Sequence, residues 1–187
     1  MKNALAISAV IFTIGFVTIP VVWSDDDHYW RGMDEYRHRS TGVATLTNAV
    51  YMEECGSCHM AYSPAMLPSS SWMKLMSGLD NHFGDTAELD AETENSITDL
   101  LLAYSADRSD YRRARKFNSS IQYGDAPLRI SKTPYFRHEH DEIPDRMVTG
   151  NPEVKSFSNC NACHIRAEQG SFNEHDIRIP GYGQWDD

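Results

Sequence analysis

Apolar residues in the middle of the chain recur at spacings of three and four, which is the period of a helix with one buried face. This pattern predicts a helix that is capped by Ser70 or Ser71 and runs to the "HFGD" stretch, where Gly84 can end it. The apolar face of this helix consists of Trp72, Leu75, Met76 and Leu79. A second helix is predicted after a cap at Asp90, with an apolar face of Ile97, Leu100, Leu101 and Tyr104. No segment keeps up the alternation of a β-strand, so the fold class is predicted to be mainly α.

The rest of the pattern predicts two small lobes and a connection between them. A helix starting near Thr47 or Asn48 leads into "ECGSCH", and "MAYSPAMLPSSS" has the prolines and serines of a loop. Residues 108–129 are polar, basic and turn-rich, which is typical of a join between lobes. We therefore expect the first lobe to cover residues 25–107 and the second lobe residues 130–187.

The N-terminal residues 1–24 have the character of a signal peptide. One lysine precedes an apolar stretch from Ala4 to Val22, and cleavage is expected before Asp25. The same stretch could instead be retained as a membrane anchor, because about 20 apolar residues suffice to span a bilayer. Pro20 and the Val-Trp-Ser sequence favour removal. In both cases the rest of the chain is exported, and a periplasmic location is expected.

All four cysteines of the 187-residue chain lie in two Cys-x-x-Cys-His runs. The six residues are Cys55, Cys58, His59, Cys160, Cys163 and His164. In an exported chain four cysteines can form two disulfides, and the same spacing can hold zinc. Neither alternative explains why a histidine follows each pair directly. Two covalent haem c groups explain all six residues, because the cysteines form thioethers to the porphyrin and the histidine binds the iron.

The formal net charge of −10 bears on the partners that the chain can take. Loss of Lys2 with the signal peptide would make the charge one unit more negative, and four haem propionates would lower it further. Nucleic acid is therefore not an expected partner. Steering toward a basic protein surface is one consequence of this charge, and an acidic surface that keeps the chain soluble explains it equally well.

His82 is the predicted second ligand of the first haem. It lies three residues after Leu79 and seven after Leu75, on the apolar face of the helix that follows the first attachment site. Methionine is the competing ligand type, and a His/Met site would have a higher reduction potential than a bis-histidine site. The available donors are Met66, Met73, Met76 and Met147.

His140 is the predicted second ligand of the second haem. If Pro134 opens a helical turn, His140 shares a face with Phe136 and Ile143. His138 lies two residues away and then points elsewhere. His175 is the main reserve ligand, whereas the remaining candidates lie in a polar N-terminal stretch and are expected at the surface. These are His28 and His38.

The sequence around these residues resembles a known family. "ECGSCHMAYSPAMLPSSSWMKLMSGLDNHFGDTAEL" resembles the first haem region of the small bacterial dihaem cytochromes c, which include the electron donor to the sphaeroides haem protein. "TPYFRHEHDEIP" and "CNACHIRAEQGSFNEHDIRIPG" resemble the second haem region, and the similarity covers about residues 48–181 in segments.

The resemblance implies an electron-transfer protein with two bis-histidine haems, in which His82 and His140 are the distal ligands. It also implies a first lobe similar to class I cytochrome c, where the carbonyl of Pro64 or Pro68 would accept a hydrogen bond from His59. Redox partners of such proteins include membrane b-type cytochromes and high-spin haem proteins.

Three functions are compatible with these features. A periplasmic electron carrier needs no open iron position and is the leading hypothesis. A dihaem protein with one open iron site would act as a peroxidase or gas binder, although the chain is short for a dihaem peroxidase. A retained N-terminal helix would make the chain a membrane-anchored redox subunit. No nucleophile–base pair or phosphate-binding glycine loop indicates an enzyme.

Overall fold

Four helices of eight or more residues form the scaffold in the computed structural model, which describes residues 42–185. They are α2 (Ala49–Gly56), α3 (Ser69–Met76), α4 (Ala91–Ala103) and α5 (Arg112–Ser120). Two shorter helices, α6 (Pro134–His138) and α7 (Cys160–Cys163), belong to the C-terminal half. A small antiparallel hairpin pairs β1 (Arg178–Ile179) with β2 (Gly183–Gln184). The predicted mainly α fold class is confirmed.

Helix α2 begins where its local sequence predicts. Asn48 is the N-cap, and its side chain accepts a hydrogen bond of 2.9 Å from the amide of Tyr51. Tyr51 is the buried residue of this short helix. The helix ends at Gly56, so Cys55 lies in its last turn and the rest of the first motif follows directly.

Helix α3 begins two or three residues earlier than predicted, and neither Ser70 nor Ser71 caps it. The N-cap position is Pro68, which has no side-chain acceptor. Asp107 takes this role from a distant part of the chain, because its carboxylate accepts from the Ser69 amide (2.8 Å) and the Ser69 hydroxyl (2.7 Å). The prediction of Ser70 or Ser71 as the cap is wrong, because the carboxylate that caps this turn is 38 residues away in sequence.

The predicted length of α3 is also wrong. The helix ends at Met76, and a short 3-10 turn (Leu79–Asn81) leads to His82. Helix α4 follows its predicted cap at Asp90, which accepts from two backbone amides of the first turn. Its residues Ile97 and Leu101 are buried as expected, whereas Tyr104 lies past the helix end and is 48% exposed.

Residues 108–129 are more than the turn-rich connection that their composition suggests. Helix α5 lies within them and buries Ala114 and Phe117. It contacts α6 and the 3-10 turn Ala106–Arg108. The expectation of a turn-rich segment is therefore wrong over α5, because two apolar residues on one face of a basic helix are enough to attach it to the core. The division of the chain into two lobes stays a prediction.

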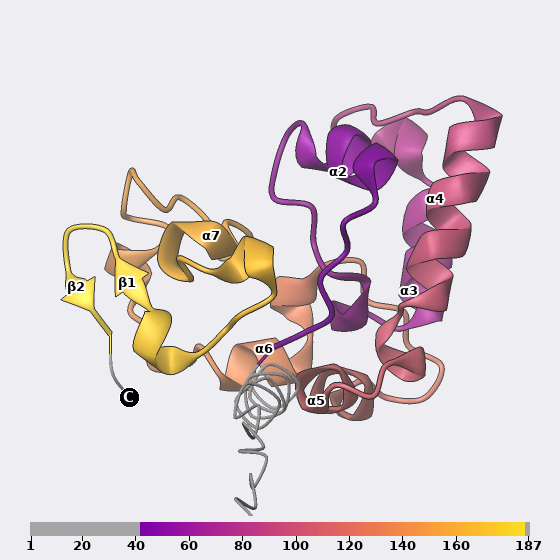
Figure 1. The fold of residues 1–187 in the computed structure, drawn as a ribbon. Helices are drawn as coiled ribbons and strands as arrows, with labels where there is room; N and C mark the ends of the chain where they lie inside the picture. Colours follow the sequence, from indigo (N-terminus) through magenta and orange to yellow (C-terminus); the bar gives the residue numbers. More distant parts are fainter. Residues whose placement is uncertain (1–41, 186–187) are drawn as a thin grey trace, which may run out of the picture.

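Figure 1 shows α2, α3 and α4 together on one side, α7 and the hairpin on the other, and α5 and α6 at the base. Three hydrophobic clusters correspond to this arrangement. The first side is packed around Tyr51, Leu67, Trp72, Met76, Ile97 and Leu101. The other side is packed around Met147, Val148, Val154 and Ile179. A third cluster joins the two halves and contains Val43, Ala65, Met66, Ala114, Phe117, Tyr135, Phe136, Ala167 and Phe172.

The predicted signal peptide or anchor (residues 1–24) lies outside the described residues, as do His28 and His38. Over residues 42–185, no helix combines the length and the apolar character that crossing a bilayer would need.

Candidate haem sites

The first Cys-x-x-Cys-His motif lies at the end of α2. Cys55 is half-buried and Cys58 is exposed. Burial raises the pKa of the Cys55 thiol to about 11, and the negative charge of Glu54 contributes to this shift to a smaller extent. The apoprotein therefore presents Cys55 as a neutral thiol rather than a thiolate at neutral pH.

His59 is oriented by its own segment of chain. Its Nδ1 lies 2.8 Å from the carbonyl oxygen of Met60, and its ring stacks on Tyr62 with centres 4.8 Å apart. The contact at Nδ1 leaves Nε2 as the nitrogen that can bind a metal. The predicted contact with Pro64 or Pro68 is wrong, because the Pro64 carbonyl accepts from the indole of Trp72 (2.8 Å) and the Pro68 carbonyl accepts from α3 amides.

The rings of His59 and His82 face one another across a gap that fits an iron ion. Their centres are 6.3 Å apart and their planes differ by 24°. Bonds of about 2 Å between a metal ion and each imidazole put two such ring centres about 6 Å apart on opposite sides of the ion. The assignment of the pair as iron ligands stays a prediction, and the geometry agrees with it.

A tight turn, not a helix face, positions His82. The amide of His82 donates to the carbonyl of Asp85 (2.7 Å), and the Asp85 amide donates back (3.3 Å). Between them, Phe83 and Gly84 have φ values of 59° and 110°, in the left-handed region that favours glycine. The prediction that His82 lies on a helix face is therefore wrong, because α3 ends at Met76, although His82 and His59 do come together. Burial lowers the pKa of His82, and the nearby His59 and Arg129 add to this effect.

The second motif forms its own short helix. Cys160–Cys163 is α7, and the amide of His164 donates to the Cys160 carbonyl (2.8 Å). Burial raises the pKa of the Cys160 thiol to about 11. Burial also lowers the pKa of His164 to about 4, with further contributions from His140 and Arg113. His164 is therefore neutral at physiological pH, and neutral imidazole is the form that binds metals.

His140 and His164 make the second pair. Their ring centres are 6.0 Å apart, again the separation that one bridging metal ion requires, but their planes differ by 71°. His140 stacks on Phe136 (3.9 Å between ring centres), and its Nδ1 lies 2.8 Å from the Phe136 carbonyl. Helix α6 ends at His138, so His140 lies just beyond it. The alternatives His138 and His175 are both exposed.

A cavity surrounds the second pair. Its lining includes both histidines, Cys160, Cys163 and Met66. The space free of protein atoms, part of it open to solvent, is about 1490 Å³. The facing histidines and the aromatic lining, which includes Phe136, Phe157 and Phe172, suit a flat, largely apolar group such as a porphyrin.

The four methionines that could replace a distal histidine lie in different surroundings. Of the four candidate methionines, Met66 lines the second cavity, Met76 and Met147 are buried in the two outer clusters, and Met73 is exposed. No cysteine is in a disulfide. In the part of the chain that the structure describes, no group of three or more His, Cys, Asp or Glu side chains is arranged to hold a metal ion. Neither the disulfide nor the zinc alternative therefore has geometric support.

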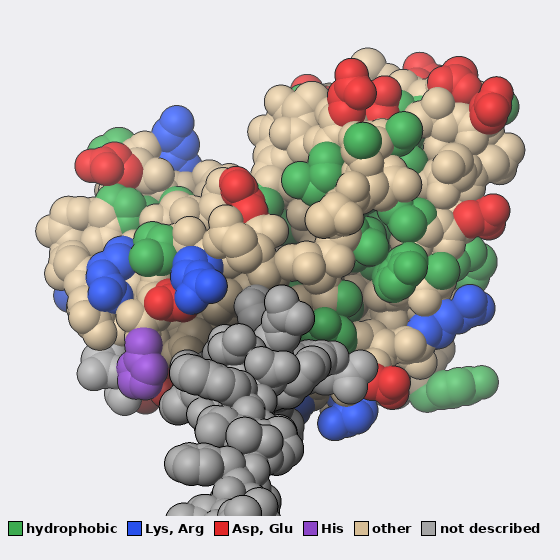
Figure 2. All heavy atoms as spheres, viewed as in Figure 1, with side chains coloured by type: hydrophobic (Ala, Val, Ile, Leu, Met, Phe, Trp, Pro, Cys, Tyr) green, Lys and Arg blue, Asp and Glu red, His purple; other side chains and the backbone are tan. Residues whose placement is uncertain are grey.

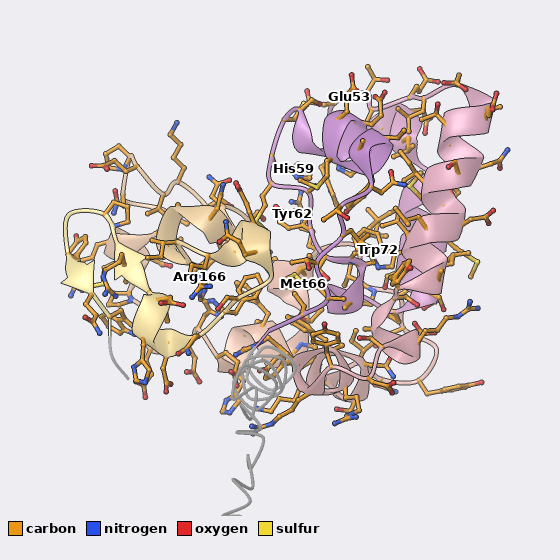
Figure 3. The ribbon with its side chains drawn as sticks, in the orientation of Figure 1. Glu53, His59, Tyr62, Met66, Trp72 and Arg166 are labelled. Atoms are coloured by element: carbon orange, nitrogen blue, oxygen red, sulfur yellow. The ribbon has the colours of Figure 1, made fainter. Side chains whose placement is uncertain are left out.

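Tyr62 connects the two motifs, a role that the sequence did not reveal. Its ring stacks on His59, and its hydroxyl donates to the carbonyl of Ser158 (2.6 Å), two residues before Cys160. Figure 3 shows His59, Tyr62 and Met66 along the segment that runs from α2 toward the middle of the molecule. Burial raises the pKa of Tyr62 to about 12, and the nearby Cys160 contributes to this shift to a smaller extent. The Tyr62 hydroxyl is therefore a neutral hydrogen-bond donor at physiological pH.

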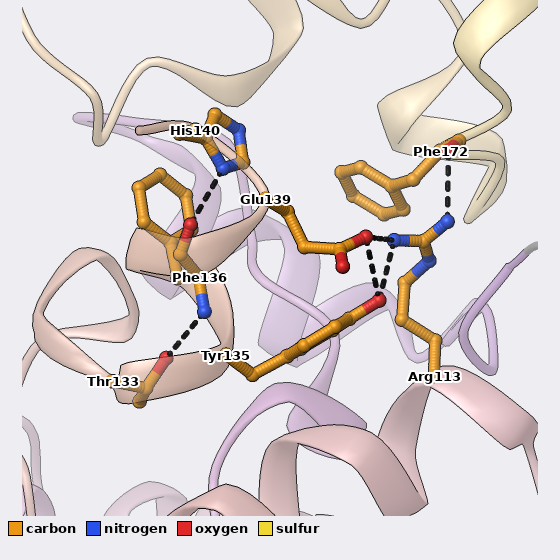
Figure 4. A network of polar contacts seen from close by, with 7 residues as sticks. All are labelled: Arg113, Thr133, Tyr135, Phe136, Glu139, His140 and Phe172. Carbon is orange, nitrogen blue, oxygen red and sulfur yellow. Dashed lines mark hydrogen bonds and ion pairs between the residues drawn. The ribbon is translucent and has the colours of Figure 1, made fainter. Parts of the chain in front are cut away.

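A polar network borders the second cavity on the side of α5 and α6 (Figure 4). Arg113 donates to the hydroxyl of Tyr135 (3.0 Å) and to the carbonyl of Phe172 (3.1 Å). The Tyr135 hydroxyl in turn donates to the Glu139 carboxylate (3.0 Å). Arg113 was not among the predicted site residues, because residues 108–129 were expected to form a connection and α5 was not predicted. The apolar spacing of Ala114 and Phe117 was the available signal for α5.

Two Cys-x-x-Cys-His sites on a mainly helical scaffold, each with a second histidine facing the first, define the class of c-type cytochromes. The family model "Dihaem cytochrome c" matches residues 51–172, and this chain belongs to that family. The family carries two covalently attached haem c groups and has a role in electron transfer. The cofactor prediction and the resemblance are therefore confirmed.

Solved structures support the same assignment. A dihaem cytochrome c from Shewanella baltica is 40% identical, with a TM-score of 0.62, and the match covers 75% of this chain and 99% of that chain. A dihaem cytochrome c from Rhodobacter sphaeroides is 42% identical, with a TM-score of 0.61, over 68% of this chain and 98% of that chain. No curated protein sequence matches this chain.

Proposed function

We propose that this protein carries electrons in the periplasm between redox partner proteins, through two six-coordinate haems. His59 and His82 would bind the first iron, and His140 and His164 the second. The observation that carries this proposal is the facing of two histidine pairs, with ring centres 6.3 and 6.0 Å apart. Two imidazoles on each iron leave no position for a substrate, and electron transfer at the haem edge requires none.

In each pair, a backbone carbonyl orients one histidine and burial affects the protonation of the other. Contacts of 2.8 Å between Nδ1 of His59 or His140 and a backbone carbonyl orient each ring toward the opposite histidine. Burial keeps His82 and His164 in the neutral form. When bound, each haem supplies a one-electron ferric/ferrous couple, and two imidazoles favour a lower potential than a histidine–methionine pair.

Location and partners are part of the proposal. The apolar leader followed by three aspartates supports export, and covalent haem attachment fits an exported chain. Figure 2 shows acidic side chains gathered over α2 and the start of α4, and residues 49–107 contain Lys74 as their single Lys or Arg. This charge supports a partner with a basic docking surface. A membrane b-type cytochrome or a high-spin haem protein would suit this role, and contact with the membrane itself would require a retained N-terminal helix.

The test of the proposal is spectroscopic. Low-temperature EPR of the oxidised protein should show two low-spin ferric haems, and optical spectra should lack a methionine–iron charge-transfer band. The reduced protein should react very slowly with carbon monoxide. A high-spin ferric signal together with fast carbon monoxide binding would instead support a peroxidase or gas-binding function.

A further inference from the structure

One arginine contacts both chain segments that carry the second histidine pair. The side chain of Arg113, 21% exposed, reaches from α5 into the wall of the second cavity. Its Nη1 donates to the Tyr135 hydroxyl (3.0 Å) and lies 3.5 Å from the Glu139 carboxylate. Its Nη2 donates to the Phe172 carbonyl (3.1 Å). We propose that Arg113 is a positioning residue that holds His140 and His164 at the separation at which both can bind one iron.

The first arm of this contact fixes His140. Tyr135 lies in α6, and Glu139 is the C-cap of this helix and immediately precedes His140. Arg113 and the Tyr135 hydroxyl both contact the Glu139 carboxylate, so the last turn of α6 is tied to α5 (Figure 4). With that turn held, the short Nδ1 contact of His140 to the Phe136 carbonyl directs the ring into the cavity.

The second arm fixes the surroundings of His164. The buried ring of Phe172 meets the His164 ring edge-on, with centres 5.2 Å apart. Because the Phe172 carbonyl accepts from Arg113, the backbone behind this ring cannot move away without breaking a hydrogen bond to a charged donor. The two arms come from one guanidinium, and they act on segments on either side of the cavity.

The chemistry of arginine suits this task. Its planar guanidinium presents donors in a fixed fork, so Nη1 and Nη2 can point at two different segments at once. Lysine keeps the positive charge as a compact group and cannot reproduce the fork. Helix α5 supplies a firm base, because Ala114 and Phe117, which follow Arg113 on this helix, are buried in the shared core.

The experiment compares Arg113→Gln and Arg113→Lys with Arg115→Gln in the full holoprotein. Arg115 lies on the exposed side of the same helix, so its variant removes the same charge without touching the cavity. With His140 and His164 both bound, carbon monoxide would reach the reduced second haem only when one of the two histidines leaves the iron. Loss of hydrogen bonds to a charged donor changes such an equilibrium by roughly ten- to a hundredfold. We expect carbon monoxide binding to become about tenfold faster or more in both Arg113 variants, with a changed EPR signal of the second haem.

Each outcome bears on the proposal. Wild-type rates and EPR signals in Arg113→Lys would show that the positive charge alone matters, and this would overturn the proposed positioning role of Arg113. An Arg113→Gln variant that behaves like wild type would overturn it as well. So would an Arg115→Gln variant that is affected as strongly as Arg113→Gln. If Arg113→Gln fails to incorporate haem, Arg113→Lys and Tyr135→Phe decide, because Tyr135→Phe removes only one acceptor and should give a smaller change of the same kind. The inference rests on the proposed ligation by His140, which is tested separately. Fast carbon monoxide binding in the unmodified protein would contradict that ligation and the role of Arg113 with it, whereas slow binding in both the unmodified protein and the Arg113 variants would contradict the role of Arg113 alone.

Discussion

The two haem sites share the same motif but hold their histidine pairs by different means. At the first site, a four-residue turn presents His82, and the rings of His82 and His59 are 24° from parallel. At the second site, His140 stacks on the buried Phe136 beside a large cavity, and its ring is turned 71° from that of His164. The first pair depends on local backbone geometry, whereas the second depends on side chains brought from α5, α6 and the C-terminal segment. The two sites should therefore respond differently to mutation.

The largest expected effect is the opening of one site at a time. His82→Ala should leave the first iron high-spin and reactive toward carbon monoxide when reduced, while the second stays six-coordinate. His140→Ala should do the converse, because each variant removes one imidazole from one pair. Optical spectra and carbon monoxide titration count the open sites. His138→Ala and His175→Ala serve as controls, since both residues are exposed. A high-spin haem in His175→Ala, and none in His140→Ala, would reassign the second ligand.

The ring angles predict two distinguishable EPR signals in the unmodified oxidised protein. Nearly parallel imidazole planes separate the energies of the iron orbitals that interact with them, whereas crossed planes leave these orbitals close in energy. The first site should therefore give a rhombic low-spin signal and the second a signal with a much larger maximum g value. The single histidine variants assign each signal to its site. Two identical rhombic signals would contradict the 71° angle at the second site.

Phe136→Ala should test the packing that supports the second site. Phe136 is buried, stacks on His140 and packs against Phe157, so its truncation should cost about 3–5 kcal/mol of unfolding free energy. Guanidinium denaturation of the holoprotein measures this loss. Tyr123→Ala is the matched aromatic control at a fully exposed position, and it should stay within about 0.5 kcal/mol of wild type. A loss below about 1 kcal/mol in Phe136→Ala would argue against packing as the support of this site.

Asp107→Ala should destabilise the first half by about 1 kcal/mol, the usual effect of losing a helix cap. Burial tends to raise the pKa of Asp107, but hydrogen bonds from Ser105 and Ser69 outweigh it and hold the pKa below its usual value. A carboxyl with a lowered folded pKa stabilises at neutral pH, and this contribution is lost as the pH falls through that pKa. The difference between wild type and variant should therefore be full at pH 7 and shrink on acidification below about pH 4. A difference that does not depend on pH would exclude the ionised carboxylate as the cap.

The smallest expected effect is that of Phe83→Gly in the turn after His82. Glycine relieves the positive φ of 59°, which costs a bulky residue about 1–2 kcal/mol. The same change removes the aromatic ring beneath Arg129 (3.8 Å), a contact worth about 0.5–1 kcal/mol. The change also removes the edge-on contact between the Phe83 and His82 rings (4.8 Å between centres), worth about 0.5–1.5 kcal/mol, so gain and losses are of similar size and thermal unfolding should shift only slightly. Gly84→Ala is the opposing control, because its φ of 110° disfavours alanine and nothing lies within 4 Å to compensate. Equal shifts in the two variants would contradict the strain argument.

Much of the fold and of the site could be predicted wherever the signal is local in sequence. The caps Asn48 and Asp90 lie next to the amides that they accept from, so sequence spacing alone predicts both helix starts. The two motifs predict covalent haem, because attachment requires its cysteines and histidine in one short segment. The apolar and stacking neighbours of His140 also lie within a few residues of it.

Only the tertiary structure decided the contacts between distant segments. Asp107 caps α3, Tyr62 reaches Ser158, and Arg113 ties α6 to the Phe172 backbone, each across many residues of chain. A hydrogen bond of this kind depends on where packing brings two segments, and residue type at one position does not encode its partner. The angle of 71° at the second pair has the same origin, since the His140 and His164 rings pack against Phe136 and Phe172, and Arg113 ties the segments that carry these residues together. The sequence by itself therefore determined that there are two haems and which histidines are candidates. The packing of α5 and α6 decided how the second pair is held apart and turned.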